Sequence, residues 1–173
     1  MEKRIAVLPG SFNPPTWGHY NMIHAAIRLY DEVHVLIATN PKKTPWIPLV
    51  DLLRILREDM EECYSDRVKI TCWAGTTIQY CEEVKAKVIL RSFRNSIDVE
   101  YEQSIAHINR KMNPLIQTVY LSLPPETSMI SSSAVRELCS IGCLDTAMEL
   151  VPGNIADYIR DHINTLNINT MQH

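Results

Sequence analysis

The chain has 173 residues and a formal net charge of -3 at pH 7, a length that suits one domain with its own core. Such a charge provides no basic field for nucleic acid or a membrane surface, so we expect neither as a partner. No apolar run reaches the roughly 18 residues of a membrane span, and the N-terminus does not resemble a signal peptide. We therefore expect a cytoplasmic protein, and we interpret its five cysteines as reduced thiols because no C-x-x-C pair occurs.

The first structured stretch is a strand followed by a polar loop and a helix. Residues 5–8 form a short apolar run that ends at Pro9 and Gly10, which is typical of a buried strand before a turn. From His19 onward, apolar residues recur at three- and four-residue spacing, which predicts an amphipathic helix. Because the N-terminus of a helix offers free N–H groups and a positive dipole end, this loop is a candidate anion site.

Strands and helices alternate along the rest of the chain. We expect further strands at 32–39, 68–72, 87–90 and 118–121, and helices at 49–60, 76–84, 97–112, 132–140, 144–150 and 154–163. This alternation predicts an α/β fold with a Rossmann-like, doubly wound, five-stranded parallel sheet and helices on both faces. We assign residues 1–163 to a single domain and residues 164–173 to a polar C-terminal tail.

Four polar loops follow expected strands: residues 10–19, 40–43, 91–94 and 124–133. Ligands of such sheets bind beyond the carboxyl ends of the strands, so we expect these loops to converge on one crevice. Arg91 and Arg94 directly follow a buried strand, where guanidinium groups suit phosphate. Three serines, residues 131–133, precede the helical pattern that starts at Ala134. One of them is explained as an N-cap, but three hydroxyls beside free N–H groups suit phosphate oxygens.

Each of these residues also has a purely structural interpretation. On local grounds His19 is more simply a first-turn helix residue, and Lys43 is more simply solvated surface. Glu102 lies in an acidic segment that favours the dipole of its own helix, so stabilisation alone explains it. The local pattern leaves both interpretations open.

Taken together, the motifs resemble bacterial phosphopantetheine adenylyltransferases of the nucleotidyltransferase superfamily. The matching segments, in order, are Pro9 to Phe12, the T-x-G-H motif from Thr16 to His19, Lys43, Arg91 with Arg94, Asp98 to Glu102 followed by Ala106 to Arg110, and Ile130 to Ser133. The D-x-E-Y-E segment followed by A-H-x-N-R is the most specific part. The resemblance extends to about residue 160.

This resemblance implies transfer of the adenylyl group of ATP to 4'-phosphopantetheine, giving dephospho-coenzyme A and pyrophosphate in coenzyme A biosynthesis. It implies that His19 stabilises the transition state, with Lys43 and Arg94 as further catalytic residues. By the same resemblance, Ser11, Lys43, Thr77 and Arg91 bind phosphopantetheine. The residues implied to bind ATP are Ser11, Phe12, His19, Ser92, Phe93, Arg94, Glu102, Thr127, Ser128, Met129, Ile130, Ser131, Ser132 and Ser133.

The resemblance carries further expectations. Mg²⁺ would arrive with ATP, held largely by phosphate and water, and we expect no metal site built from protein side chains. A homo-oligomer is expected, a hexamer by family analogy, and feedback by coenzyme A is left open. Ser92 stands where the family usually has glycine, and serine would cost about 1 kcal/mol if that position required a positive φ. The alternatives are adenylyl or cytidylyl transfer to another phosphate acceptor, such as nicotinate mononucleotide, and a non-catalytic nucleotide-binding relative.

Overall fold

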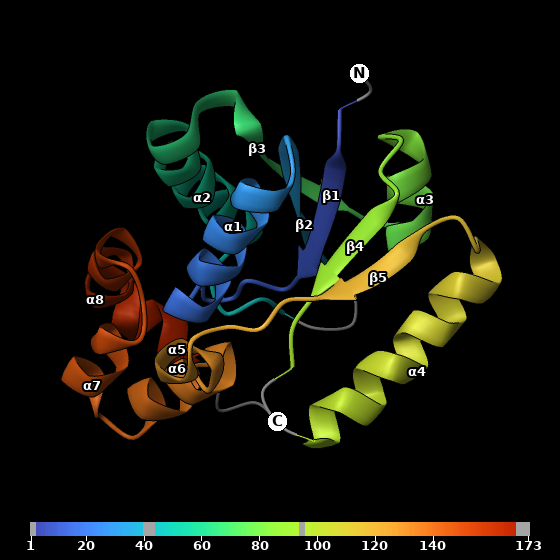
Figure 1. Ribbon diagram of the computed structural model, residues 1–173. Coiled ribbons are helices and arrows are strands. Elements are labelled where there is room, and N and C mark those ends of the chain that lie inside the picture. The colour runs from blue at the N-terminus through green and yellow to red at the C-terminus, as the bar shows by residue number, and fades with distance from the viewer. Residues whose placement is uncertain (1–2, 40–43, 94–95, 169–173) are drawn as a thin grey trace.

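A five-stranded parallel sheet organises the chain (Figure 1), in a computed structural model that describes residues 3–39, 44–93 and 96–168. The strands are β1 (Ile5–Gly10), β2 (Glu32–Ala38), β3 (Val68–Trp73), β4 (Val88–Arg91) and β5 (Gln117–Tyr120). Their order is β3-β2-β1-β4-β5, and every neighbouring pair is parallel. The order reverses direction between β1 and β4, which is the point where doubly wound sheets bind ligands.

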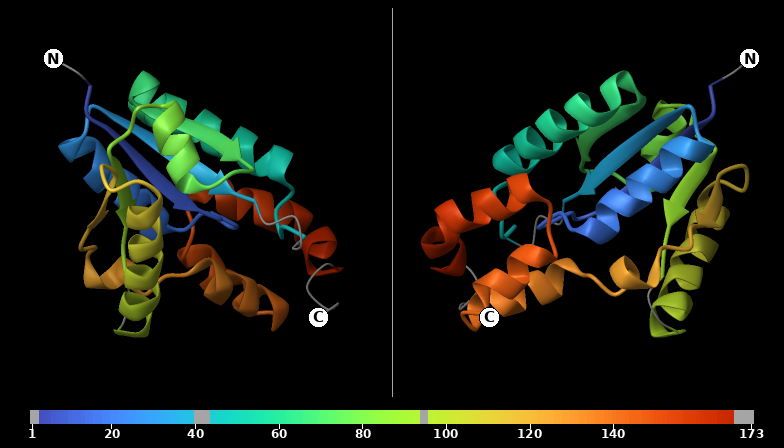
Figure 2. Two further views of the ribbon diagram at one scale, coloured as in Figure 1. Left: turned by 90° about the vertical axis from the view of Figure 1, so that its right-hand side faces the viewer. Right: turned by 60° about the vertical axis from the view of Figure 1, so that its left-hand side comes forward.

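Helices cover both faces of this sheet (Figures 1 and 2). One face carries α1 (Trp17–Leu29) and α2 (Leu49–Tyr64), with α8 (Gly153–Ile168) packed against α2. The other face carries α3 (Thr77–Glu83), and α4 (Ser96–Met112) runs beside β5. Three short helices, α5 (Pro125–Ser128), α6 (Ser132–Ser140) and α7 (Leu144–Glu149), follow the last strand, and a 3-10 turn (Ser65–Arg67) links α2 to β3. The predicted α/β fold class is confirmed.

Successive strand residues enter two separate apolar cores. Ala6 and Leu8 of β1 lie in the larger core with α1, α2 and α8, whereas Val7 between them lies in the smaller core with α3. β2 alternates in the same way, with Val35 on the larger side and Leu36 on the smaller. A sheet buried on both faces favours apolar side chains on both, which is why residues 5–8 of β1 and 35–38 of β2 appear in the sequence as continuous apolar runs.

The observed elements differ from the predicted ones most clearly at the ends of two long helices and in one short helix. The helix α2 continues to Tyr64, and α8 continues to Ile168, beyond the predicted ends at 60 and 163. Leu166 explains the second difference, since it is only 2% exposed in the larger core, so residues 164–168 are helix and not tail. The four-residue helix α5 was not predicted because it is too short to show a periodic pattern. No helix within the described residues has the length and apolar character needed to cross a membrane.

Candidate active site

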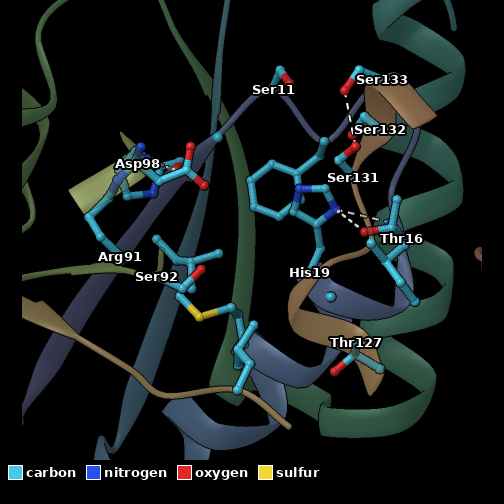
Figure 3. A pocket seen from close by; sticks show the side chains of 18 of the residues that line it. Ser11, Thr16, His19, Arg91, Ser92, Asp98, Thr127, Ser131, Ser132 and Ser133 are labelled. Atoms are coloured by element: carbon cyan, nitrogen blue, oxygen red, sulfur yellow. Dashed lines mark hydrogen bonds between the residues drawn. The ribbon is translucent and has the colours of Figure 1, made fainter. Parts of the chain in front are cut away.

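A cavity of about 490 Å³ lies beyond the carboxyl ends of β1 and β4 (Figure 3), within the size range typical of small-molecule sites. The predicted site residues that line it are Ser11, Phe12, His19, Arg91, Ser92, Glu102, Thr127, Ile130, Ser131, Ser132 and Ser133. They come from three of the four loops expected to converge and from the N-terminal halves of α1, α4 and α6. The fourth loop, residues 40–43, lies outside the described residues.

Six predicted residues remain, of which three are placed away from the cavity wall. Lys43 and Arg94 lie outside the described residues. Thr77 begins α3, and Phe93 and Met129 are exposed; none of these three is among the lining residues. Ser128 ends α5. The substrate contacts assigned to all six stay predictions.

The loop between β1 and α1 holds Phe12 in an unusual conformation. Phe12 has a φ of +50°, in the left-handed region that a bulky residue rarely adopts, yet it is only 1% exposed. Its ring lies 4.6 Å from that of His19, centroid to centroid. A Cβ at Gly10 would come within 2.8 Å of the Phe12 ring, so glycine there makes room for it. Such backbone strain is found most often at functional sites.

The T-x-G-H motif forms the start of α1, and Thr16, Gly18 and His19 each contribute to the local structure. Thr16 is the N-cap of the helix, and its backbone N–H donates to Nδ1 of His19 at 3.0 Å. The hydroxyl of Thr16 lies 2.9 Å from the same nitrogen (Figure 3). Gly18 lets the helix approach the α5 turn, since a Cβ there would lie 3.0 Å from the carbonyl oxygen of Thr127.

Arg91 and Glu102, for which different substrates were predicted, bind each other across the cavity wall. Nε of Arg91 donates to Glu102 at 2.7 Å, Nη2 donates to its other carboxylate oxygen, and Nη1 donates to the carbonyl of Pro9 at 2.8 Å. Glu102 is only 7% exposed, so this bidentate pair fixes the plane of the Arg91 guanidinium. The neighbouring Ser92 is not among the described non-glycine residues with positive φ, so the strain considered for serine there does not arise.

The serine turn before α6 serves partly as a cap and partly as a tether. The Oγ of Ser131 accepts from the backbone N–H of Ala134 at 3.1 Å, as expected of an N-cap. Ser132 instead donates to the carbonyl of Pro14 at 2.8 Å, which fastens the turn to the β1–α1 loop. Ser133 lies 3.0 Å from Ser131, oxygen to oxygen, and both line the cavity.

Arg136 is a cavity residue that the sequence analysis missed. Its Nη1 donates to the carbonyl of Asn13 at 2.6 Å, and the Asn13 amide in turn makes two hydrogen bonds of 2.8 Å with the backbone of Ile47. Burial lowers the pKa of the Arg136 guanidinium, which marks a cost of desolvation that a bound anion would offset. The available signal was spacing, because Arg136 follows Ser132 by four residues and so lies on the same face of α6.

The chemistry of this cavity favours an anion. Two arginines, several hydroxyls and the N-termini of α1 and α6 face it. Across the described residues, no three histidine, cysteine, aspartate or glutamate side chains are arranged to hold a metal ion. A phosphate ester would therefore suit the arginines, hydroxyls and helix N-termini of this cavity.

Comparison with known proteins gives consistent relationships. The sequence profile of the cytidylyltransferase-like family matches residues 7–138. A phosphopantetheine adenylyltransferase from Clavibacter michiganensis is 38% identical over 157 residues, covering 90% of this chain and 94% of the relative. Another from Caldanaerobacter subterraneus is 32% identical over 159 residues, covering 91% of this chain and 96% of the relative. In fold, the chain is similar to the Plasmodium falciparum nicotinic acid mononucleotide adenylyltransferase complexed with APC, with a TM-score of 0.68. The two are 14% identical, and the match covers 99% of this chain and 100% of the other.

Proposed function

Because the chain belongs to the cytidylyltransferase-like family and, within it, to the phosphopantetheine adenylyltransferases, we propose that it transfers the adenylyl group of ATP to 4'-phosphopantetheine. The products are dephospho-coenzyme A and pyrophosphate. The observation that carries the proposal is the cavity at the switch point of the sheet. His19, the serine turn (residues 131–133) and Arg91 line this one cavity, which suits an anion. Nicotinate mononucleotide is the alternative acceptor, in view of the fold shared with enzymes of that name.

The attacking group in this reaction is already a phosphate anion, so no side chain needs to act as a nucleophile. Catalysis then depends on holding the two substrates in line and on stabilising the charge that develops on the α-phosphate. His19 is the residue that we assign to the α-phosphate, and the serine turn with Arg136 to the β- and γ-phosphates. We assign Arg91, which Glu102 orients, and Lys43 to the acceptor phosphate.

Mg²⁺ fits this scheme as a companion of ATP. Magnesium prefers oxygen ligands and keeps several waters, so phosphate oxygens and water suffice to hold it. The hydroxyls of Thr127, Ser131 and Ser133 near the proposed triphosphate path are compatible with such a hydrated ion. When bound, the cation would neutralise charge on the leaving pyrophosphate.

We also propose a homo-oligomer, a hexamer by family analogy, in the cytoplasm. Apolar side chains on and just after α4 support self-association, since Tyr101 is 63%, Ile108 52%, Met112 48% and Leu115 78% exposed. Five free cysteines suit a reducing compartment. Light scattering coupled to size exclusion would measure the assembly, and a monomer at micromolar concentration would contradict it.

The direct test is pyrophosphate release by the purified protein with ATP and Mg²⁺. Three reactions are compared: 4'-phosphopantetheine, nicotinate mononucleotide, and no acceptor. We expect release with 4'-phosphopantetheine alone. Release only with nicotinate mononucleotide would favour the alternative acceptor, and ATP binding without any release would favour a non-catalytic role.

The acceptor subsite can be tested through two adjacent lysines. Lys43→Ala should raise the KM for 4'-phosphopantetheine about tenfold or more, with a smaller change for ATP, because a charge-assisted contact to phosphate is lost. Lys42→Ala is the matched control and should leave both constants unchanged. A larger effect of Lys43→Ala on ATP would mean that the two subsites are exchanged.

A further inference from the structure

The segment between β5 and α6 forms one wall of the cavity. Leu123, Thr127 and Ile130 of this segment line the cavity, and Thr127 is labelled in Figure 3. The helix α5 within it has only four residues, and a helix this short does not hold its place by its own backbone hydrogen bonds. Contacts with another element are therefore needed to fix this wall.

One face of α1 provides that support. A Cβ at Gly18 would lie 3.0 Å from the carbonyl oxygen of Thr127 and 3.3 Å from that of Ile130, so the two segments approach closely at this glycine. Asn21 follows Gly18 by three residues and so lies on the same face of the helix. Its Nδ2 donates to the hydroxyl of Thr127 at 2.8 Å. Gly18 makes room for the wall, and Asn21 bonds directly to it.

The bond from Asn21 decides where the Thr127 hydroxyl directs its proton. A hydroxyl has one proton and two lone pairs. The amide of Asn21 occupies one lone pair, so the proton points away from the amide, and it is donated to the carbonyl of Pro124 at 3.3 Å. This second bond is long. A phosphate oxygen is charged and forms shorter and stronger bonds, so it competes well for the same proton.

We propose that Asn21 is a positioning residue for the nucleotide, which holds Thr127 so that its hydroxyl donates a hydrogen bond to the triphosphate of ATP. The identity of the nucleotide rests on the proposed adenylyl transfer. Asn21 is not among the described residues that line the cavity, so it acts through Thr127. A hydroxyl that accepts one hydrogen bond is polarised and donates a stronger one. The amide thus sets both the place and the donor strength of Thr127.

A double-mutant cycle tests this link without turnover. Calorimetry measures the Kd of a non-hydrolysable ATP analogue for the wild type, Asn21→Leu, Thr127→Val and the double variant. We expect each single substitution to raise the Kd about fivefold, as for one lost hydrogen bond. The double variant should bind about as well as the weaker single variant, because both substitutions remove the same interaction. Independent losses, which would multiply to about 25-fold, would overturn the inference.

Asn21→Asp tests the direction of the bond and keeps the shape of the side chain. A carboxylate can only accept, so the proton of Thr127 would turn toward it and a lone pair would face the phosphate instead. We expect the Kd for the analogue to rise about tenfold or more, beyond the effect of Asn21→Leu. A Kd at or below that of Asn21→Leu would show that the amide does not act as a donor to Thr127.

Steady-state kinetics separate positioning from a purely structural role. Asn21→Leu should raise the KM for ATP about fivefold and leave kcat nearly unchanged, because only binding of the nucleotide is weakened. Thr127→Ser keeps the hydroxyl and should behave as the wild type. Asn164→Leu, at an exposed position of α8, is the matched control and should change neither constant.

Two outcomes distinguish the role of Asn21 from the proposed reaction. A fall in kcat for Asn21→Leu with an unchanged KM for ATP would contradict the role of Asn21 and leave adenylyl transfer intact. Absence of turnover with every acceptor, together with a coupled loss of analogue affinity in the cycle, would refute the proposed reaction and support the role of Asn21.

Discussion

The molecule has a polar cluster at each end of its sheet, and each contains a histidine. At the amino end, His34 is only 4% exposed and bonds through both nitrogens, to Tyr80 at 2.8 Å and to Glu32 at 2.6 Å. At the carboxyl end, His19 uses Nδ1 for Thr16 and lines a cavity. A ring whose two nitrogens are bound inside the protein serves the fold. A ring that lines a cavity is placed to act on a ligand.

The two clusters also differ in how their charges are compensated. Glu32 receives hydrogen bonds or ion pairs from Lys3, His34 and Lys69, all within 3.0 Å. Burial by itself would raise the pKa of the Glu32 carboxyl, but the hydrogen bonds from Lys69, His34 and Lys3 lower it to about 2. In the cavity, by contrast, Arg136 bonds only a backbone carbonyl among the contacts described here. The first cluster is internally complete, whereas the second gains from an added anion.

The largest difference between the two clusters is expected for the effect of substitution on activity, and His19→Ala tests it. We expect kcat to fall by about a thousandfold or more, in the range seen when a transition-state donor is removed, with little change in ATP affinity or in the urea midpoint of unfolding. Steady-state pyrophosphate release measures kcat, and isothermal calorimetry with an ATP analogue measures the affinity for ATP. A loss of less than tenfold would remove His19 from its assigned role. The counterpart His34→Gln should lower stability and leave kcat unchanged.

Next in size is Glu32→Gln, which should lower the free energy of unfolding by about 2 kcal/mol at pH 7, because the buried His34 and two exposed lysines lose a charged hydrogen-bond partner. The folded-state pKa of about 2 lies below the ordinary value of 4.5. The carboxylate therefore stabilises the fold above pH 4.5 and loses this effect as the pH falls toward 2. We expect the difference in the free energy of unfolding between the wild type and Glu32→Gln, measured with urea, to fall to about half between pH 5 and pH 3. A constant gap would contradict the assignment.

A smaller effect is expected at Arg136. Arg136→Met keeps much of the side-chain length, and should raise the KM for ATP about tenfold, since a charge-assisted contact is worth roughly 1.5 to 3 kcal/mol. The exposed Arg160 of α8, which pairs with Asp157 in its own helix, provides the control, and Arg160→Met should leave the ATP kinetics unchanged. Equal ATP kinetics for both variants would exclude Arg136 from the triphosphate path.

The smallest effect is expected for Asp31→Asn. Hydrogen bonds from Arg4 lower the pKa of the Asp31 carboxyl to about 2, yet the pair is exposed, with 68% and 44% of the two side chains accessible. Exposed ion pairs contribute little because water and salt screen them. The urea midpoint of this variant should match the wild type at pH 7. A shift as large as that of Glu32→Gln would mean that burial does not distinguish the two carboxylates.

Much of the fold could be predicted because local patterns and burial agree along the chain. Each predicted strand is present, and all neighbouring strands are parallel, as the alternation of strands and helices predicts. Contacts between distant segments could not be predicted from such patterns. The pairing of Arg91 with Glu102 and the bond from Arg136 to Asn13 depend on which helix faces come together. The α8 boundary was wrong because one buried leucine, Leu166, outweighs its polar neighbours.

The tethers of the β1–α1 loop bear on how the chain acquires its site during synthesis. Asn13 bonds the backbone of Ile47, Ser132 bonds Pro14, and Arg136 bonds Asn13. A domain folds as a unit, so the β1–α1 loop gains its tethers from Ser132 and Arg136 only when the chain has been synthesised through α6. A chain that ends after β5 would lack both of these tethers and one wall of the cavity.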